Sequence, residues 1–330
     1  QMADPGKVLV TGATGFIGYE VARMLCARGL RPRLLVRRPL RAALLSSLDA
    51  ELVQGDLEMP SSLERAVQGV DTVIHLGARA IFEEYGLVRP TIVDGSVALM
   101  RAAAAAGVRR LVYTSSLLVY ADQEQDIDRD TPAVSKLGYG RAKLEAEAAL
   151  SDLGREAGMV FASIRLPHVY GARDLMFEQL RRGRVVMPGN GRNRFAHLHV
   201  EDAARVLLAV AEQGWSGVSP VADDLAVDWN EFFAVVREYY PRLRHRGVPK
   251  WLALLGTQLL TPTRRLSRYP SLHTPDAVRG WNLNVPVQKG LLWDELDIAP
   301  RYPTIHHGIP AVLDDSVAFR WIHPVADRIG

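Results

Sequence analysis

The sequence predicts an α/β fold in which buried strands alternate with helices around a parallel sheet. The chain has 330 residues, enough for one large α/β domain and a smaller lobe, and 48% of them are hydrophobic. Apolar runs of strand character alternate with amphipathic helical segments as far as about residue 171. This short, regular cycle is typical of a doubly wound sheet, whose ligands bind beyond the carboxyl ends of the strands.

The first strand and helix are joined by closely spaced glycines. Residues 8–11 have strand character, Gly12, Gly15 and Gly18 follow, and residues 19–26 have helical spacing. A helix N-terminus presents free N–H groups and a partial positive charge, and glycine lets a phosphate approach the backbone. The turn therefore predicts a site for a dinucleotide pyrophosphate, although a glycine triplet by itself fits an ordinary tight turn equally well.

The following strands end in polar or small residues. Strands are expected at 33–36, 52–57, 71–78 and 109–116, and helices near 60–64 and at 97–106. Arg37 and Arg38 follow the second strand, where arginine accommodates the 2′-phosphate of NADP(H) and an acidic residue binds the 2′-hydroxyl of NAD(H). The pair favours NADP(H), with NAD(H) and plain surface charge as the alternatives. Asp56, Gly77 and Ser116 also fall at strand ends.

A tyrosine and a lysine open a long helical segment at residues 139–149. Tyr139 and Lys143 are four apart and share one helical face, so the ammonium favours the phenolate form of the tyrosine. A phenol whose pKa is ordinarily ~10 then becomes a usable proton donor or acceptor. Taken alone the pair is weak evidence, because any exposed helix can carry it.

The histidines are interpreted as structural. His75 lies among apolar residues of the fourth strand, as packed or hydrogen-bonded histidines do. His197 and His199 fall in a predicted strand, and His306 and His307 are sequence neighbours. No cysteine or tight acidic cluster lies near them, so no metal site is expected.

A series of ordered motifs covers nearly the whole chain: Thr11–Gly18, Asp56–Leu57, His75–Ala78, Thr114–Ser116, Tyr139–Lys143, Arg165–Gly171, Gly189–Gly191, His199–Asp202 and Ala299–Thr304. Together they resemble the extended short-chain dehydrogenase/reductase family, within the NAD-dependent epimerase/dehydratase-like superfamily. The resemblance implies a Rossmann domain at 2–171, to which 194–213 return. An interleaved substrate lobe would comprise 172–193 and 214–330.

The resemblance also implies the roles of individual residues. Tyr139 would be the general acid/base, and Lys143 would bind the nicotinamide ribose and keep the pKa of the phenol low. Ser116, or else its neighbour Ser115, would hydrogen-bond the substrate carbonyl. The cofactor-binding residues would be Gly12, Thr14, Gly15, Phe16, Ile17, Arg37, Arg38, Asp56, Leu57, Leu76, Gly77, Ala78, Tyr139, Lys143, Pro167 and Val169.

Three departures from the family pattern bear on the reaction. Leu117 and Leu118 occupy the positions where the dehydratases carry Asp-Glu, so dehydration is not expected. His168 follows Pro167 where epimerases and dehydratases tend to have asparagine, and Ile92 replaces another frequent asparagine. These features favour the branches similar to dihydroflavonol reductases and 3β-hydroxysteroid dehydrogenases.

The last part of the chain is expected to form the substrate side. Its aromatic residues are expected mainly in the core of the lobe, with some lining a pocket: Trp229, Phe232, Phe233, Tyr239, Tyr240, Trp251 and Tyr269. The apolar segment 250–261 is expected to be a buried helix, in preference to a lid or a contact with a membrane or partner subunit. Residues 181–184, rich in arginine, would contact an anionic group or form a solvated turn.

Composition limits the remaining functions. The net charge is only +3 with the basic residues spread along the chain, so nucleic-acid binding is not expected. The single cysteine, Cys26, excludes an internal disulfide and is interpreted as a buried thiol. No apolar segment reaches membrane-spanning length and no signal peptide is seen, so a cytoplasmic protein is expected.

The sequence thus predicts an NADP(H)-dependent oxidoreductase that interconverts a ketone and a secondary alcohol on a small or medium, rather apolar molecule. One alternative is a sugar-nucleotide epimerase with tightly bound NAD. A second is a non-catalytic cofactor-sensing protein on the same fold. Fold analogy alone suggests a homodimer.

Overall fold

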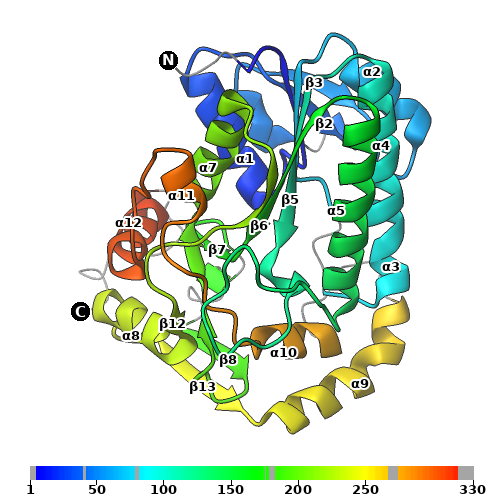
Figure 1. Cartoon of the computed structure of the whole chain (residues 1–330). Helices are drawn as coiled ribbons and strands as arrows, with labels where there is room; N and C mark the ends of the chain where they lie inside the picture. Colours follow the sequence, from blue (N-terminus) through cyan, green and yellow to red (C-terminus); the bar gives the residue numbers. More distant parts are fainter. Residues whose placement is uncertain are drawn as a thin grey trace.

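The computed structural model describes residues 5–39, 42–78, 82–174, 176–177, 183–266 and 274–318. Its centre is a seven-stranded parallel sheet (Figure 1). The strands, in spatial order, are β11 (Gly217–Pro220), β6 (Val160–Leu166), β5 (Arg110–Ser116), β4 (Thr72–His75), β1 (Val8–Thr11), β2 (Arg33–Val36) and β3 (Glu51–Gln54). The prediction of a doubly wound α/β sheet is confirmed.

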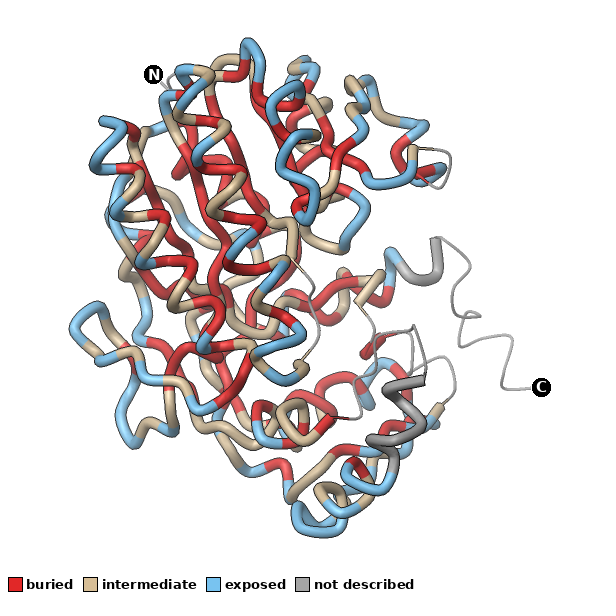
Figure 2. Tube along the Cα trace, turned by 90° about the vertical axis from the view of Figure 1, so that its right-hand side faces the viewer, coloured by how far each residue is buried: buried red, intermediate tan, exposed pale blue. Residues whose placement is uncertain are grey.

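Helices cover both faces of this sheet because its strands are apolar on both sides. Within β1, Val10 packs into the core beneath α1 (Phe16–Ala27) and α7 (Val200–Gln213). The adjacent Leu9 packs into the opposite core, beneath the second group of helices. That group comprises α2 (Leu63–Val67), α4 (Gly95–Ala105) and α5 (Gly138–Glu156), and the short α3 (Tyr85–Arg89) leads into α4 through a π-helical turn at Pro90–Asp94. Figure 2 shows the central strands of the sheet buried and the helices beside them buried along the side that faces the sheet.

The strand arrows of the sheet point toward a smaller lobe at the lower end of the molecule in Figure 1. Its strand pairs are β7 (His168–Tyr170) with β10 (His197–His199), β9 (Arg194–Phe195) with β12 (Val227–Asp228), and β8 (Arg184–Pro188) with β13 (Arg244–Val248). Its helices are α8 (Trp229–Tyr239), α9 (Lys250–Leu266), α10 (Pro275–Trp281) and α12 (Ile305–Ala318), while α11 (Leu292–Glu295) lies beside α7. A third core forms around Tyr170, Trp229, Phe232 and Phe233.

Two details of the predicted domain division are wrong. Strand β11 pairs with β6 at the edge of the main sheet, so residues after Gly214 do not all belong to the smaller lobe. The strand in the returning segment, β10, pairs with β7 and not with the main sheet. Pro167 separates β6 from β7, because proline has no N–H to continue a ladder, and the chain turns there toward the lobe.

Three burial predictions are also wrong. The start of α9 is exposed, with Trp251 67% and Leu259 71% accessible. Tyr239 is exposed too, and Cys26 is only half-buried, with its Sγ donating to the Asp49 carbonyl at 3.4 Å. Tyr269, Arg181 and Arg182 lie outside the described residues. Among the described helices, none has the length and apolar character needed to cross a membrane.

Candidate active site

The glycine-rich turn between β1 and α1 is packed against the turn that follows β4. Gly12 has φ +74°, and a Cβ there would lie 2.9 Å from the Gly77 nitrogen. A Cβ on Gly18 would lie 2.2 Å from the Gly12 carbonyl oxygen, so only glycine lets α1 start this close to the strand. Glycine is therefore required at both positions for the two turns and the helix to meet.

The first turn of α1 is open to an anion. Its N-cap, Gly15, has no side chain to occupy the N–H groups, and the first turn holds no acidic residue. Thr14 and Gly15 are exposed, while Phe16 and Ile17 are half-buried against the body of the domain. Uncapped N–H groups together with the helix dipole suit a phosphate, so this turn fits the pyrophosphate of a dinucleotide.

A buried hydrogen-bond chain fixes the second turn, Leu76–Ala78. The Gly77 N–H donates to Thr11 Oγ1 at 2.8 Å, and Thr11 Oγ1 is 2.7 Å from His75 Nδ1. His75 Nε2 is 2.8 Å from Ser96 Oγ, which donates to the Ile92 carbonyl at 2.5 Å. Because Ser96 uses its proton on Ile92, it accepts from Nε2, which leaves Nδ1 to accept from Thr11.

His75 is therefore a neutral structural residue, as predicted. Burial, reinforced by the positive charge of Lys143, lowers the pKa of His75 to about 3. Leu76 and Ala78, which flank Gly77, are half-buried beside the first glycine turn.

Replacing Thr11 with valine is expected to lower the free energy of unfolding by about 1–3 kcal/mol. The change leaves His75 Nδ1 without a donor and the Gly77 N–H without an acceptor, and unsatisfied buried groups cost about that much. Urea unfolding measures the loss. Thr14→Val is the matched control, because Thr14 is exposed in the same turn. Equal effects from the two variants would show that the chain does not stabilise the fold.

The predicted adenosine-side residues gather at the ends of β2 and β3. Arg37 and Arg38 are exposed, and neither pairs with an acidic residue in the described part of the chain. Asp56 is half-buried, and its Oδ1 accepts from the Glu58 N–H at 3.1 Å. Leu57 is buried, and a Cβ on Gly77 would lie 3.0 Å from its Cδ1. Two unpaired guanidinium groups beside the glycine turns fit an anionic cofactor.

The predicted catalytic residues come from the end of β5 and the start of α5. Ser116 ends β5, and its Oγ accepts from the Leu118 N–H at 3.2 Å. Lys143 Nζ donates to the Thr114 carbonyl of the same strand at 2.7 Å and lies 5.8 Å from the ring centre of Tyr139. Helix and strand thus bring the hydroxyl, ammonium and phenol to one region of the molecule.

Burial shifts the pKa of Tyr139 in the direction opposite to the one expected from the sequence. It raises the pKa of Tyr139 to about 12 and lowers the pKa of Lys143 to about 7. Burial therefore outweighs any lowering of the phenol pKa by Lys143 in this arrangement. The reason is that the ammonium is bonded to the Thr114 carbonyl and not to the phenol, while the edge of Phe82 packs on the Tyr139 ring at 5.5 Å.

A buried ion pair supports Lys143 from one helical turn further along α5. Glu147 is 6% exposed; its Oε1 accepts from Arg165 Nη2 at 2.5 Å and its Oε2 from Ser163 Oγ at 2.6 Å. Arg165 Nη1 donates to the Tyr120 hydroxyl at 2.7 Å. The negative charge of Glu147 raises the pKa of Lys143 and so opposes the effect of burial. The i, i+4 spacing of the lysine and glutamate was visible in the sequence, but it is equally typical of an exposed helix face.

Comparison with known proteins decides the family. The profile of the NAD dependent epimerase/dehydratase family matches residues 8–222. The chain belongs to this family. The match includes the glycine turn, β5 and the tyrosine–lysine pair of α5, so the assembled site lies in the part that the family shares.

Two curated relatives of this epimerase/dehydratase family member are named as redox enzymes. A ceramide reductase of Caulobacter vibrioides is 34% identical over 226 residues, which are 66% of this chain and 65% of that protein. A 3-beta-hydroxysteroid dehydrogenase of Mycolicibacterium neoaurum is 29% identical over 227 residues, 63% of this chain and 62% of that protein. The matched region therefore spans less than two-thirds of either relative.

A solved structure shares the whole fold. The UDP-glucose 4-epimerase of Thermus thermophilus, crystallised with NAD, gives a TM-score of 0.77 at 22% identity and covers 94% of this chain and 99% of that one. Likeness at this identity shows the fold, which is that of extended short-chain dehydrogenase/reductase enzymes. The family is described as NAD dependent, and the two relatives are named as a reductase and a dehydrogenase.

The histidine that departs from the epimerase pattern lies in an aromatic cluster. His168 Nδ1 is 3.0 Å from His197 Nδ1, and the His168 ring packs edge-on against Trp229 at 5.0 Å. Pro167 and Val169, on either side of it, are half-buried. The described residues hold no group of three or more His, Cys, Asp or Glu side chains placed to bind a metal. His168 is half-buried, and its ring packs against the aromatic core of the lobe.

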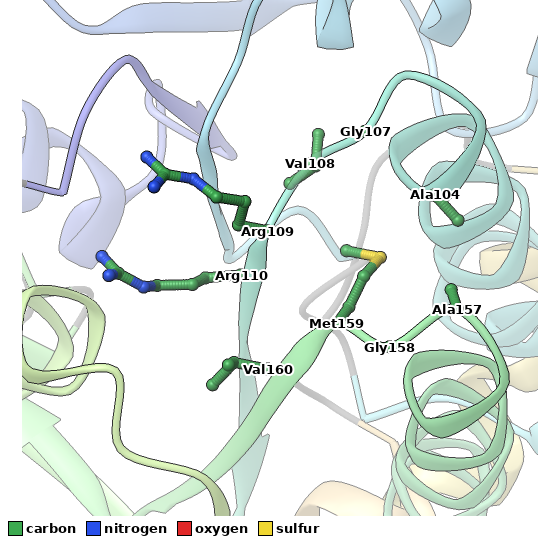
Figure 3. Close-up of a pocket in the computed structure, with 9 residues that line it drawn as sticks. All are labelled: Ala104, Gly107, Val108, Arg109, Arg110, Ala157, Gly158, Met159 and Val160. Atoms are coloured by element: carbon green, nitrogen blue, oxygen red, sulfur yellow. The ribbon is translucent and has the colours of Figure 1, made fainter.

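A cavity of about 450 Å³ lies away from the predicted catalytic residues (Figure 3). Its lining comes from Ala104, Gly107, Val108, Arg109, Arg110, Ala157, Gly158, Met159 and Val160. These residues surround the amino ends of β5 and β6, whereas Ser116 stands at the carboxyl end of β5. Ligands of doubly wound folds bind at the carboxyl ends, so this cavity is not the expected cofactor site.

Proposed function

We propose that the protein is an NADP(H)-dependent oxidoreductase that interconverts a ketone and a secondary alcohol on a small or medium, rather apolar substrate. The observation that carries the proposal is the protonated phenol of Tyr139 in one region with Ser116 and Lys143. A pKa of about 12 keeps that phenol protonated at neutral pH. It is then ready to donate a proton to an oxygen that becomes negative as a carbonyl is reduced.

The chain's own residues provide a place for the cofactor, which supplies or accepts the hydride when bound. The N–H groups at the start of α1, next to Gly12, Thr14 and Gly15, would bind the pyrophosphate. Arg37 and Arg38 would bind the 2′-phosphate, and Asp56 and Leu57 would flank the adenine. The ribose and nicotinamide would lie along Leu76, Gly77, Ala78, Lys143, Pro167 and Val169.

Three side chains would act on the substrate oxygen. Ser116 would donate a hydrogen bond to it, and Tyr139 would donate the proton in reduction and remove it in oxidation. Lys143, four residues after the tyrosine, would orient the bound ribose and stabilise negative charge on the phenol oxygen. No step in this scheme needs a metal.

The residues after Ser116 support an apolar substrate and oppose dehydration. Leu117 is 1% and Leu118 7% exposed, and neither has a carboxyl group that could protonate a departing hydroxyl. The two relatives are named for a ceramide and a steroid, both apolar molecules. A reductase acting on an apolar ketone agrees with both observations.

A sugar-nucleotide epimerase is the second candidate. The supporting observation is the likeness to a UDP-glucose 4-epimerase over 94% of the chain. Such an enzyme reduces and reoxidises a retained NAD within one cycle, so it consumes no cofactor. Arg37 and Arg38, exposed and without an acidic partner among the described residues, favour the reductase instead.

NADPH consumption separates the two functions. The purified protein is mixed with NADPH and, in separate reactions, with aliphatic, aromatic and steroidal ketones and with UDP-sugars. Net oxidation of NADPH by a ketone is expected. Conversion of a UDP-sugar without net cofactor consumption would overturn the reductase proposal and establish the epimerase.

The double variant Arg37→Ala with Arg38→Ala is expected to raise the KM for NADPH roughly 10–100-fold while changing the KM for NADH little. A charge-assisted hydrogen bond is worth about 1.5–3 kcal/mol, and about 1.4 kcal/mol corresponds to a tenfold change. Initial rates with the two cofactors give the measurement. Arg31→Ala is the control, because Arg31 is exposed just before β2 and pairs with Asp49. Equal changes for NADPH and NADH would refute a 2′-phosphate site.

Reduction is expected to slow as the pH rises through the pKa of Lys143, about 7. The ammonium is present below this pH and lost above it, whereas the phenol, with a pKa of about 12, stays protonated throughout. Rates from pH 6 to 9, an interval chosen to bracket the lysine pKa, test this. In Lys143→Arg the guanidinium keeps its charge, so its profile should be flat even though its rate is lower. An unchanged alkaline limb in this variant would assign the limb to another group.

A further inference from the structure

The outer face of α9 carries large apolar side chains. Trp251 is 67%, Leu252 44%, Leu255 45% and Leu259 71% exposed. Residues 252, 255 and 259 follow the i, i+3, i+7 spacing of a single helical stripe, with Trp251 beside it. Thr257, at 5% exposure, faces the protein, and Ala253 and Leu254 are partly buried. The helix thus leaves a stripe of large apolar side chains exposed.

This concentration of apolar surface stands out from the rest of the described molecule. Twelve large hydrophobic side chains are exposed in the described residues, and four of them belong to these few turns of α9. Single exposed apolar residues are common on soluble proteins, whereas a contiguous patch marks an interaction surface. In Figure 1, α9 lies along the lower right edge of the molecule, and no other labelled element lies beyond it in this view.

The chain around this helix is strongly basic. Residues 239–275 contain no aspartate or glutamate but carry Arg242, Arg244, Arg246, Lys250, Arg264, Arg265 and Arg268. These seven positive charges exceed the net charge of +3 of the whole chain. The segment that carries the apolar stripe is therefore a local concentration of positive charge.

Strand β13 presents part of this charge directly next to the helix. Arg244 and Arg246 are exposed and pair in register with Arg184 and Val186 of β8. Residues opposite each other in a ladder point to the same face, so three arginines and Val186, which is 65% exposed, share one surface. Only Pro249 separates β13 from Lys250, the first residue of α9. We call the exposed α9 stripe and this arginine ribbon the basic-apolar surface.

We propose that the basic-apolar surface binds the face of an anionic lipid bilayer. In this arrangement α9 lies in the plane of the membrane, with Trp251 and the leucines at the boundary between headgroups and acyl chains. The arginines of β13 and β8 contact lipid phosphates. A second copy of the chain is not expected to cover this surface. Two copies face to face would place positive charge against positive charge, and the two surfaces would repel each other.

Sedimentation with vesicles tests the proposal on the full-length protein. The probes are vesicles of phosphatidylcholine alone and of phosphatidylcholine with phosphatidylglycerol. The protein is expected to bind the anionic vesicles at least tenfold more tightly than the neutral ones, and its binding should weaken as salt increases. Because the readout is lipid binding without substrate or cofactor, its result is independent of the proposed reductase activity.

Two pairs of variants assign the binding to the surface. Leu255→Glu with Leu259→Glu should weaken binding to anionic vesicles at least tenfold, because carboxylates would enter the headgroup boundary. Leu52→Glu, at a 40% exposed leucine on the edge strand β3, should not. Arg244→Gln with Arg246→Gln should also weaken binding, whereas Arg155→Gln, at an exposed position on α5, should leave it unchanged. Thermal unfolding confirms that each variant is folded.

Three outcomes would overturn the proposal. One is the absence of binding to anionic vesicles. Another is binding that the α9 variant retains in full. The third is a lipid-free dimer that the α9 variant dissociates, which would show that a second copy of the chain covers the stripe.

Discussion

Tyr139→Phe is expected to lower kcat for ketone reduction by about 10²–10⁴-fold, the range that general acid catalysis supplies. The variant removes the one proton donor that the proposed mechanism places at the substrate oxygen. The ring and its edge contact with Phe82 remain, so the fold should persist. NADPH binding, followed by fluorescence titration, should change little because the phenol acts on the reaction and not on the pyrophosphate site.

Tyr239→Phe is the matched control for this loss of a hydroxyl. Tyr239 is 44% exposed at the end of α8, within the lobe but on its surface. Its kcat should stay within twofold of the unmodified protein's, by our order-of-magnitude expectation for a surface change. If Tyr139→Phe also retained turnover within a few-fold, Tyr139 would not be the general acid.

Glu147→Ala is expected to lower the free energy of unfolding by about 3–5 kcal/mol, because removing one partner of a buried ion pair leaves the other charge uncompensated. Arg165 would keep only its bond to the Tyr120 hydroxyl, and Ser163 would lose its acceptor. Urea unfolding measures the loss. As a second readout, the alkaline limb of the activity profile should move to lower pH, because Glu147 no longer raises the pKa of Lys143.

Asp152→Ala gives the control on the same helix. Asp152 pairs with Arg155, and their side chains are 64% and 75% exposed, so the change should cost less than about 1 kcal/mol. Combining Glu147→Leu with Arg165→Met should recover much of the stability, because an apolar pair of similar volume needs no charge compensation. A loss in Glu147→Ala no greater than that in Asp152→Ala would mean that the buried pair is not stabilising.

Strand positions in the first half of the domain could be predicted because each strand is a continuous apolar run bounded by turn residues. The β11 strand could not, since its sequence, Gly217–Pro220, has the residues of a loop. It forms a strand because it lies at the edge of the sheet, where one ladder is enough and proline is tolerated. Tertiary context outweighed local preference there.

Helix periodicity shows that α9 is amphipathic but not which of its faces meets the protein. The segment was expected to bury its apolar stripe, yet Trp251 and Leu259 face outward. The same limit applies to the site. Spacing placed Tyr139 and Lys143 on one helical face, but the direction of the Tyr139 pKa follows from burial and from the partner that Lys143 binds. Burial and the hydrogen-bond partner of Lys143 both depend on tertiary packing, which residue spacing does not show.

The hydrogen-bond chain through Thr11, His75 and Ser96 has a consequence for ligand affinity. It ties the ends of β1 and β4 to α4, so the two turns they carry form one rigid cradle. A loop that folds around its ligand loses conformational entropy on binding, and that loss subtracts from affinity. In this protein the two turns lose that conformational entropy when the chain folds, so ligand binding does not have to supply it. The Gly77 amide should accordingly exchange its hydrogen slowly even before any nucleotide is added, with protection close to that of the sheet itself.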